Sequence, residues 1–189
     1  MASFSYFDPS LEQMISQHNF KEKFTGQLRC LARNDSGLTT LDLTWSQIGD
    51  TGATALTQAL SFNSTLTTLD LSHIQMEDTG AAAISQALSS NSSLTKLDLT
   101  FNQIGDTGAT ALLQALSFNS SLFTLNLLNN KVSDGVILSI HKQMETNQHN
   151  KIMHSKTLQQ LCYSSLCPAD KSILKIEFPS FYALYFSSS

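Results

Sequence analysis

A 28-residue period constrains the fold of this chain more than any other feature of its sequence. Copies of one unit occupy residues 38–65, 66–93 and 94–121, and a looser copy occupies 122–149. The first and third copies share 23 of their 28 residues, so the period reflects duplication. A fixed period of about 20 to 50 residues is typical of a stacked array of one supersecondary unit. We therefore look for function first on a surface that the copies share.

Each unit begins with the pattern Leu-x-x-Leu-x-Leu, as in Leu38, Leu41 and Leu43 of the first copy. The alternation around the last two leucines has a period of two and predicts a short strand. The leucines would lie on one face of this strand, and Thr40 and Asp42 would lie on the other. A turn is expected after the strand, followed by a helix.

The second half of each unit predicts a helix with one apolar face. Asp50, Asp78 and Asp106 mark the helix starts, and we expect each carboxylate to accept hydrogen bonds from the free amides of its own first turn. Each unit ends in a polar loop rich in Ser and Asn. No single unit can bury its apolar face, so the units are expected to stack into one core. In the first copy the apolar stripe is Gly52, Ala55, Leu56, Ala59 and Leu60.

This pattern resembles the ribonuclease-inhibitor-like subfamily of leucine-rich repeats. The resemblance rests on Leu-x-x-Leu-x-Leu followed by Gln-Ile-Gly-Asp-Thr-Gly-Ala-Thr-Ala-Leu-x-Gln-Ala-Leu over residues 38–149. It implies an α/β fold, a right-handed horseshoe segment of a solenoid with parallel strands on the concave side and helices on the convex side. The near-identical repeats rich in Ser, Thr and Asn also resemble the short leucine-rich-repeat effectors of intracellular bacterial pathogens.

The asparagine that this family usually places three positions after the third leucine is present in only half of the copies. It stands at Asn102 and Asn130, whereas Ser46 and Ile74 replace it in the first two copies. We therefore expect the side-chain hydrogen-bond ladder of the family in the later repeats. Along the first two repeats the ladder is expected to be weaker, with the serine as a partial substitute.

Charge is sparse in this sequence and unevenly distributed. Charged residues make up 14% of the chain, against roughly 25% in an average soluble protein. Between residues 38 and 121 there are seven acidic residues and one basic residue, Lys96, so this segment has a net charge of −6. Because phosphate binding depends on clustered Lys and Arg, nucleic acid is not expected as the partner. A protein with a basic or mixed-charge surface is expected instead.

The chain has three cysteines, Cys30, Cys162 and Cys167. Because this number is small and odd, a disulfide framework is not expected. This favours a reducing, cytoplasmic compartment. The first residues contain no basic segment followed by an apolar run, so a bacterial effector would be secreted without a cleavable signal. No stretch reaches the roughly 20 apolar residues of a membrane span. We expect a monomer without a cofactor.

Both ends of the chain depart from the period. Residues 1–37 are interpreted as an N-terminal helical cap and half repeat, in which one helix starts at Pro9 and a second, over about 21–32, aligns Leu28 with Leu56. Residues 134–148 predict the helix of the fourth repeat. Residues 150–189 are interpreted as a C-terminal cap or tail, and a translocation signal at the end of this tail is the alternative.

Stacking at a fixed period converts each outward strand position into a column that crosses the repeats. Neighbouring parallel strands lie about 4.8 Å apart, so the carboxylates of one column would line up at that spacing. The first column is Thr40, Thr68, Lys96 and Thr124, the second is Asp42, Asp70, Asp98 and Asn126, and the third is Thr44, Ser72, Thr100 and Leu128. Just past the strand lies a further column of Trp45, His73, Phe101 and Asn129.

Two interpretations of these columns remain open. In the functional interpretation, the acidic column binds a basic segment of a partner protein, while Trp45 and Phe101 act as anchors of the kind found in interface hot spots. In the structural interpretation, each aspartate pairs with flanking threonine hydroxyls and was copied by duplication. The exposed aromatic residues beside the column favour the functional interpretation.

No catalytic group is predicted in the repeats. Asp70 lies near His73, but Ser72 is expected on a flat strand and not on the strained turn of a hydrolase nucleophile. We therefore predict a non-catalytic protein-interaction module that binds a partner on its concave face. The alternatives are a regulator of an enzyme such as a GTPase and a C-terminal metal site, although its spacings differ from common zinc knuckles. The candidate metal ligands are His149, His154, Cys162 and Cys167.

Overall fold

A computed structural model of the 189-residue chain describes residues 9–18 and 20–148. The chain divides into two compact units, Met1–Glu145 and Thr146–Ser189, and all four strands lie in the first unit. In the described part of the chain, no helix is long and apolar enough to cross a membrane. The interpreted cap or tail at 150–189 and the four candidate metal ligands lie outside the described residues.

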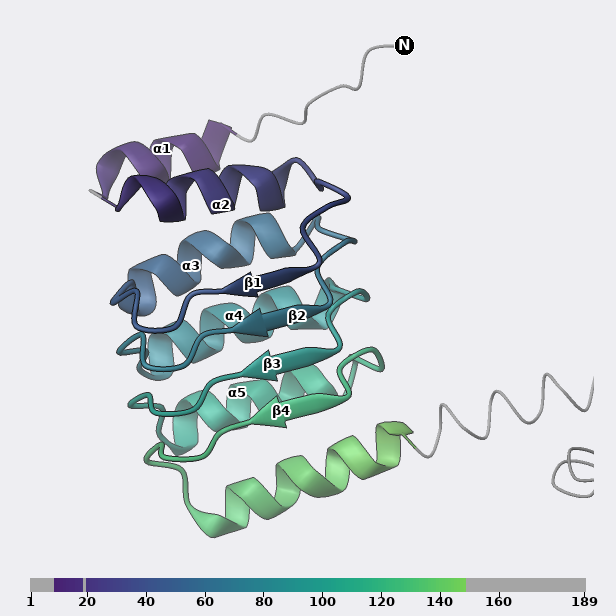
Figure 1. Cartoon of the computed structure of the whole chain (residues 1–189). Helices are drawn as coiled ribbons and strands as arrows, with labels where there is room; N and C mark the ends of the chain where they lie inside the picture. Colours follow the sequence, from purple (N-terminus) through teal and green to yellow (C-terminus); the bar gives the residue numbers. More distant parts are fainter. Residues whose placement is uncertain (1–8, 19, 149–189) are drawn as a thin grey trace, which may run out of the picture. The chain divides into compact units, whose positions relative to one another are not determined.

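Strands and helices alternate along the repeats, after two helices that come first (Figure 1). The fourth strand is followed by a helix over residues 134–148, as predicted. Each predicted strand is present, and each is three residues long. The elements are α1 (Pro9–Gln17), α2 (Glu22–Ala32), β1 (Thr40–Asp42), α3 (Gly49–Leu60), β2 (Thr68–Asp70), α4 (Asp78–Ser90), β3 (Lys96–Asp98), α5 (Asp106–Leu116) and β4 (Thr124–Asn126).

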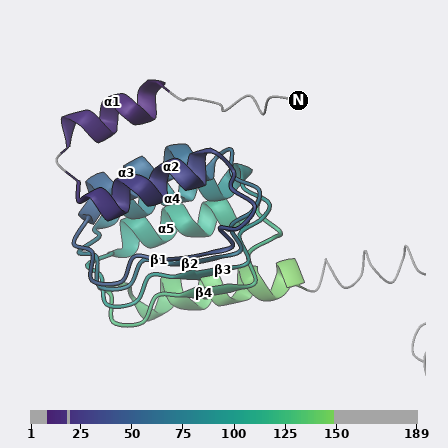
Figure 2. The ribbon, with the colours of Figure 1, turned by 45° about the horizontal axis from the view of Figure 1, so that its top comes forward.

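The four strands form one parallel sheet in the order β1-β2-β3-β4. Paired residues are 28 positions apart, as in Thr40 with Thr68 and Lys96 with Thr124. Helices α3, α4 and α5 lie side by side on one face of this sheet (Figure 2). Each helix thus connects one strand to the next parallel strand, which is the usual crossover of parallel sheets. The α/β arrangement predicted from the period is confirmed.

The leucines of the repeat pattern form the core between the sheet and the helices. Leu41, Leu69 and Leu97 are buried, and so are the third leucines of the pattern. The predicted helix stripe needs one correction, because Ala83 and its counterpart in α5 are only half-buried. Ala81 is fully buried instead, since the flank of each helix packs closely against the next helix. The alanines equivalent to Ala81, which are buried in the same way, are Ala53 and Ala109.

The aspartates at the helix starts do not cap their own helices, so this prediction was wrong. None of α3, α4 and α5 has a side-chain hydrogen bond at its N-cap. Each aspartate lies within the first turn, and its carboxylate reaches the backbone of the following repeat. The accepted hydrogen bonds come from the amide of Glu77 to Asp50 (2.7 Å), from the amides of Gly105 and Gly108 to Asp78 (2.6 and 3.0 Å), and from the amide of Ser133 to Asp106 (2.7 Å).

Asn102 forms the expected ladder between the second and third repeats. Its Oδ1 accepts hydrogen bonds from the amides of Ile74 and Met76 at 3.2 and 3.0 Å, and its Nδ2 donates to the Leu71 carbonyl at 2.8 Å. Asn130 joins the third and fourth repeats in the same way. Serine is no substitute in the first repeat, because the Ser46 hydroxyl is buried without a hydrogen-bond partner.

A second asparagine ladder joins the repeats at the opposite ends of the helices, where the sequence analysis predicted only polar loops. Asn91 is buried, and its Nδ2 donates to the carbonyls of Leu60 and Asn63 at 2.9 and 2.8 Å. Its Oδ1 accepts from the amide of Leu94 at 2.8 Å. Asn63 and Asn119 make equivalent hydrogen bonds. This second ladder also covers the early repeats, where the first ladder is missing.

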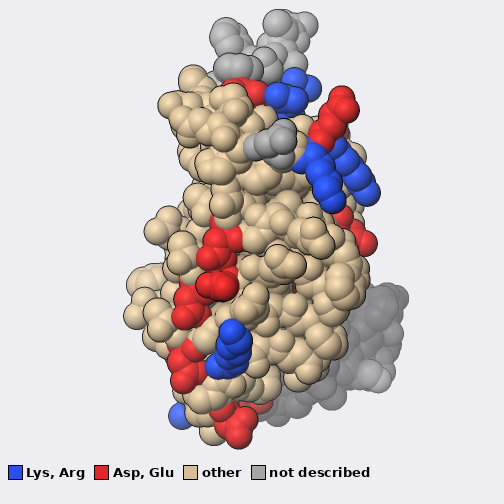
Figure 3. Space-filling model, turned by 90° about the vertical axis from the view of Figure 1, so that its left-hand side faces the viewer, with Lys and Arg blue, Asp and Glu red and all other residues tan. Residues whose placement is uncertain are grey.

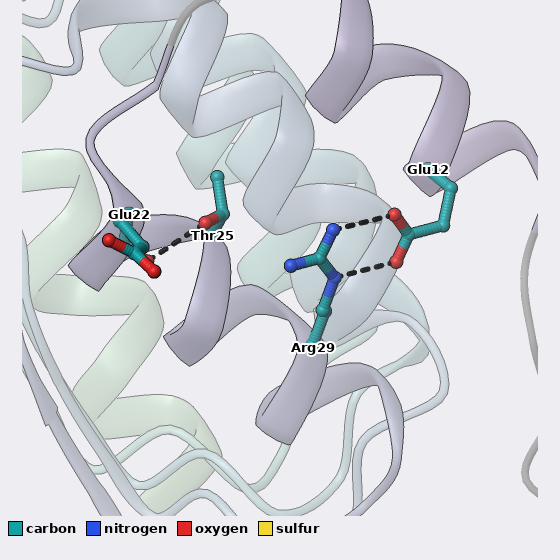
Figure 4. Close-up of polar contacts among 4 residues, drawn as sticks. All are labelled: Glu12, Glu22, Thr25 and Arg29. Atoms are coloured by element: carbon teal, nitrogen blue, oxygen red, sulfur yellow. Dashed lines mark hydrogen bonds and ion pairs between the residues drawn. The ribbon is translucent and has the colours of Figure 1, made fainter.

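An ion pair holds α1 against α2 (Figure 4). Arg29 in α2 donates from Nε and Nη2 to the two carboxylate oxygens of Glu12 in α1, at 2.8 and 2.9 Å. The hydrogen bond from Arg29 lowers the pKa of Glu12. Leu11 adds a buried apolar contact from α1 to the core. Helix α1 therefore belongs to the helical side of the molecule.

Candidate protein-binding surface on the strand face

The strand register brings the predicted acidic column together. Asp42 pairs with Asp70, Asp70 with Asp98, and Asp98 with Asn126. All four side chains are exposed or half-buried. Figure 3 faces the edge where the strands end and the helices begin, and acidic residues also recur along this edge. The strand register makes the column continuous across the sheet.

Each aspartate of this column also stabilises the turn that follows its strand. Asp70 Oδ1 accepts hydrogen bonds from the amide and the hydroxyl of Ser72, at 2.9 and 2.6 Å. Asp42 and Asp98 accept from the amides two positions further on. This is the local geometry that makes aspartate a common turn residue. The hydroxyl and the amide of Thr44 lower the pKa of Asp42, which is therefore charged at neutral pH.

Trp45, His73 and Phe101 form one continuous stack of rings beside the acidic column. The ring centroids of Trp45 and His73 are 3.8 Å apart, and those of His73 and Phe101 are 4.3 Å apart. The rings are nearly parallel, with interplanar angles of 14° and 11°. Trp45 is 66% exposed and Phe101 is 52% exposed. The repeat spacing therefore holds three aromatic rings at stacking distance on an open surface.

The backbone that carries these rings is left-handed. The φ angles are 60° at Trp45, 55° at His73 and 54° at Phe101, a region that bulky side chains rarely adopt. Hydrogen bonds across the repeats hold this conformation, because each of the three amides donates to the carbonyl of the next turn. The acceptors are Ser72 for Trp45 (3.3 Å), Thr100 for His73 (3.2 Å) and Leu128 for Phe101 (3.0 Å).

The remaining predicted residues border the acidic column. Thr40, Thr68 and Lys96 form the column at the start of the strands, as the pairing shows. Lys96 is exposed and is the basic residue between residues 38 and 121. Asn126 ends the acidic column, where its Nδ2 donates to Asp98 Oδ2 at 3.4 Å. The fourth repeat therefore replaces a carboxylate with an amide that bonds to the preceding carboxylate.

Phe62, Phe118 and Phe123 are further exposed phenylalanines that the sequence pattern did not single out. Phe62 and Phe118 are exposed in the loops after α3 and α5, at the opposite ends of the helices from the aromatic stack. The feature of the sequence that could have identified Phe62 and Phe118 is a large apolar residue inside a loop of Ser and Asn. Because the two residues occupy equivalent positions in the first and third repeats, they provide a matched comparison for Trp45 and Phe101.

The polar and aromatic side chains of this surface bond to and stack on one another. Ser72 lies in the turn after β2, not on the strand as predicted, and its hydroxyl donates to Asp70. The His73 ring is packed between two aromatic rings. Within residues 9–18 and 20–148, no group of three or more His, Cys, Asp and Glu side chains could hold a metal ion.

The model of the TMOD/LMOD leucine-rich domain family matches residues 22–175. The chain belongs to this family. The match begins at the first residue of α2 and includes every residue of the acidic and aromatic columns. The leucine-rich-repeat fold is confirmed, whereas membership of the ribonuclease-inhibitor-like subfamily is not.

One similar solved structure agrees with this fold. A structure described as "Leiomodin-1 Actin-Binding Site 2 (ABS2)" is 22% identical, with a TM-score of 0.62, and the alignment covers 75% of this chain and 99% of that one. The tropomodulin C-terminal domain of Caenorhabditis elegans is 12% identical, with a TM-score of 0.49, covering 70% of this chain and 97% of that one. No curated protein matches the chain.

Proposed function

We propose that this TMOD/LMOD leucine-rich domain is a non-catalytic protein-interaction module that binds its partner on the strand face. The stack of Trp45, His73 and Phe101 is the observation that supports this proposal. Exposed aromatic rings in one continuous surface are typical of binding sites, and aromatic residues are enriched among the residues that dominate binding energy.

The stack is already ordered before a partner binds. Ring contacts and backbone hydrogen bonds hold each side chain in place, so little conformational entropy is lost on association. The carboxylates of Asp42, Asp70 and Asp98 lie beside the rings and favour a partner with basic residues next to an apolar patch. The two interpretations of the acidic column are compatible, because one carboxylate can hold its turn and still carry a negative charge at the surface.

Actin is the partner that we propose to test first. The support is family membership together with the similar leiomodin-1 structure, which is described as an actin-binding site. Binding to actin would place the chain in the cytoplasm, which fits the odd number of cysteines. The bacterial effector remains a prediction that no comparison supports. A GTPase regulator also remains a prediction, and no feature of the described residues favours it.

The experiment compares actin binding by wild type and by Trp45→Ala with Phe101→Ala. Co-sedimentation with filamentous actin and a fluorescence titration with monomeric actin measure the two forms separately. We expect the double variant to lose about tenfold or more in affinity, because truncating hot-spot residues typically costs more than 1 kcal/mol each. Phe62→Ala with Phe118→Ala removes two phenylalanines from equivalent repeats elsewhere on the surface and should bind like wild type.

Two outcomes would contradict the proposal at different levels. If wild type binds neither form of actin, actin is the wrong partner, and a pull-down from cell lysate with wild type and the Trp45/Phe101 variant tests the surface alone. If actin binds but both double variants bind equally well, the aromatic stack is not the site. Circular dichroism spectra of all proteins verify that the variants are folded.

A further inference from the structure

The helical layer extends one element further than the strand layer at the N-terminal end of the repeats. Leu28 of α2 lies 28 residues before Leu56 of α3, and both are fully buried, so α2 occupies the position of a repeat helix. The matching strand would comprise residues 12–14, which are part of α1. Figures 1 and 2 show α1 on the helical side, and no strand of the described chain lies beyond β1.

The backbone of β1 presents an amide and a carbonyl group toward this open side. One repeat later, the Thr68 amide donates back to the Thr39 carbonyl at 3.1 Å, and the Asp70 carbonyl accepts from the Leu43 amide at 3.0 Å. Thr40 and Asp42 are the equivalents of Thr68 and Asp70, so their backbone groups face the side without a neighbouring strand. An edge of this kind can pair with an extended chain.

A pocket of about 360 Å³ lies at this edge. Phe20, Lys21, Lys23 and Phe24 line one wall, and the end of β1 with its turn, including Ser46, lines the other. The buried Ser46 hydroxyl has no hydrogen-bond partner. At the equivalent position, the side chain of Asn102 accepts hydrogen bonds from two backbone amides of the preceding repeat. The Ser46 side chain therefore lies where the backbone amides of a neighbouring strand and turn would donate hydrogen bonds.

The walls of the pocket indicate the chemistry of its ligand. Phe20, which is half-buried, and the edges of the buried Phe24 and Leu43 give the pocket an apolar lining for alternate side chains of a strand. The walls carry two positive charges, those of Lys21 and Lys23, and one negative charge, that of the Asp42 carboxylate. The excess of positive charge favours acidic residues in the ligand.

We propose that this pocket is a docking site for an extended segment of a partner protein with alternating apolar and acidic residues, which pairs with β1 as a fifth parallel strand. The N-terminal edge site, as we name these residues of the pocket and β1, shares Asp42 with the acidic column and contains no residue of the aromatic stack. It is therefore a second binding site, which adjoins the one proposed above at Asp42.

The chain itself supplies a probe for this site. The segment 66–78, Leu-Thr-Thr-Leu-Asp-Leu-Ser-His-Ile-Gln-Met-Glu-Asp, contains β2, which pairs with β3 of the third repeat. The third repeat matches the first at 23 of 28 positions, so a synthetic peptide of this sequence should fit β1 in the same register. Its leucines would face the pocket, and Glu77 and Asp78 are the acidic residues available to the lysines, because Asp70 would lie beside Asp42 in this register.

The test is a fluorescence anisotropy titration of the labelled 66–78 peptide with the full chain. We expect saturable binding that Lys21→Glu with Lys23→Glu weakens by about tenfold, because both rim charges are reversed. Lys131→Glu with Lys142→Glu makes the same change in net charge elsewhere and should leave binding unchanged. Ser46→Asn should tighten binding severalfold, since the longer amide can reach the backbone of the peptide.

Several results would overturn the proposal. They are the absence of saturable binding, equal binding of a peptide with the same residues in scrambled order, and equal binding by the two lysine variants. Self-association that requires Lys21 and Lys23, measured by sedimentation, would assign the edge to a second copy of the chain. Trp45→Ala with Phe101→Ala should bind the peptide like wild type, so failure of this proposal and failure of the strand-face proposal can be told apart.

Discussion

At the scale of single residues, polar side chains that recur every 28 residues bond one repeat to the next. Asp78 bonds to two amides of the third repeat, and Asn91 bonds to carbonyls of the first. Buried polar groups cost free energy unless they are paired, so these residues favour one stacking register over others. Ser46 departs from this rule, because the repeat that would supply its partner is incomplete.

Acid should weaken the bond between Asp106 and Ser133. The amide and then the hydroxyl of Ser133 lower the pKa of Asp106. A carboxyl with a lowered folded-state pKa stabilises the fold above its unfolded pKa of about 3.9, and this contribution is lost as pH falls through the folded pKa. We expect the difference in free energy of unfolding between wild type and Asp106→Asn to shrink in that range, as measured by urea denaturation at several pH values. A difference that is constant from neutral to acidic pH would contradict this mechanism.

At the scale of elements, close helix packing explains the glycine near each helix start. A Cβ added to Gly108 would lie 2.8 Å from Asp78 Oδ1, 2.9 Å from Ala81 Cβ and 3.0 Å from Asp78 Cα. The backbone of α4 cannot move away without losing the hydrogen bonds of Asp78. Small residues at this position therefore set the distance between neighbouring helices.

Two glycine substitutions test this packing with opposite expected signs. Gly108→Ala should lower the free energy of unfolding by about 1–3 kcal/mol, as overpacking usually does. Gly26 is an exposed position of α2, where an added Cβ meets nothing within 4 Å, so Gly26→Ala should raise the free energy of unfolding by about 0.5–1 kcal/mol through higher helix propensity. Urea denaturation of both variants provides the measurement. Equal effects of the two substitutions would show that the α4–α5 contact does not limit the size of residue 108.

At the scale of the whole repeat array, stability depends on contacts between neighbours. The buried apolar residues form one cluster that runs from Leu11 to Met144. Each repeat contacts mainly the repeats beside it, as expected for a solenoid. A local defect in the middle of the array should therefore spread to the repeats around it.

Leu99→Ala tests this coupling. Leu99 is fully buried, and its truncation should lower the free energy of unfolding by about 2–5 kcal/mol. Trp45 is the single tryptophan and lies two repeats away, so its fluorescence reports on the first repeat and on its contact with His73 of the second. We expect the unfolding transitions by Trp45 fluorescence and by circular dichroism to shift together. A shift in circular dichroism with an unchanged fluorescence transition would mean that the repeats unfold independently.

The sequence by itself determined the order of elements, the strand register and the identity of the columns. A 28-residue period with leucines at fixed offsets allows one alignment of the copies, and strand alternation assigns each residue to a face. The period alone therefore places Asp42, Asp70 and Asp98 in one column. The core leucines followed for the same reason, because both features depend only on spacing along the chain.

Only the tertiary structure decided what the polar and aromatic side chains bond to. Asp50 reaches an amide 27 residues away and does not cap its own helix, since its direction depends on how closely the next helix approaches. The stacking of Trp45 on His73 depends on a left-handed turn that no local pattern predicted. The open edge of β1 exists because α1 packs on the helical side. Spacing specifies which residues are neighbours, whereas the approach of whole elements decides which of their atoms meet.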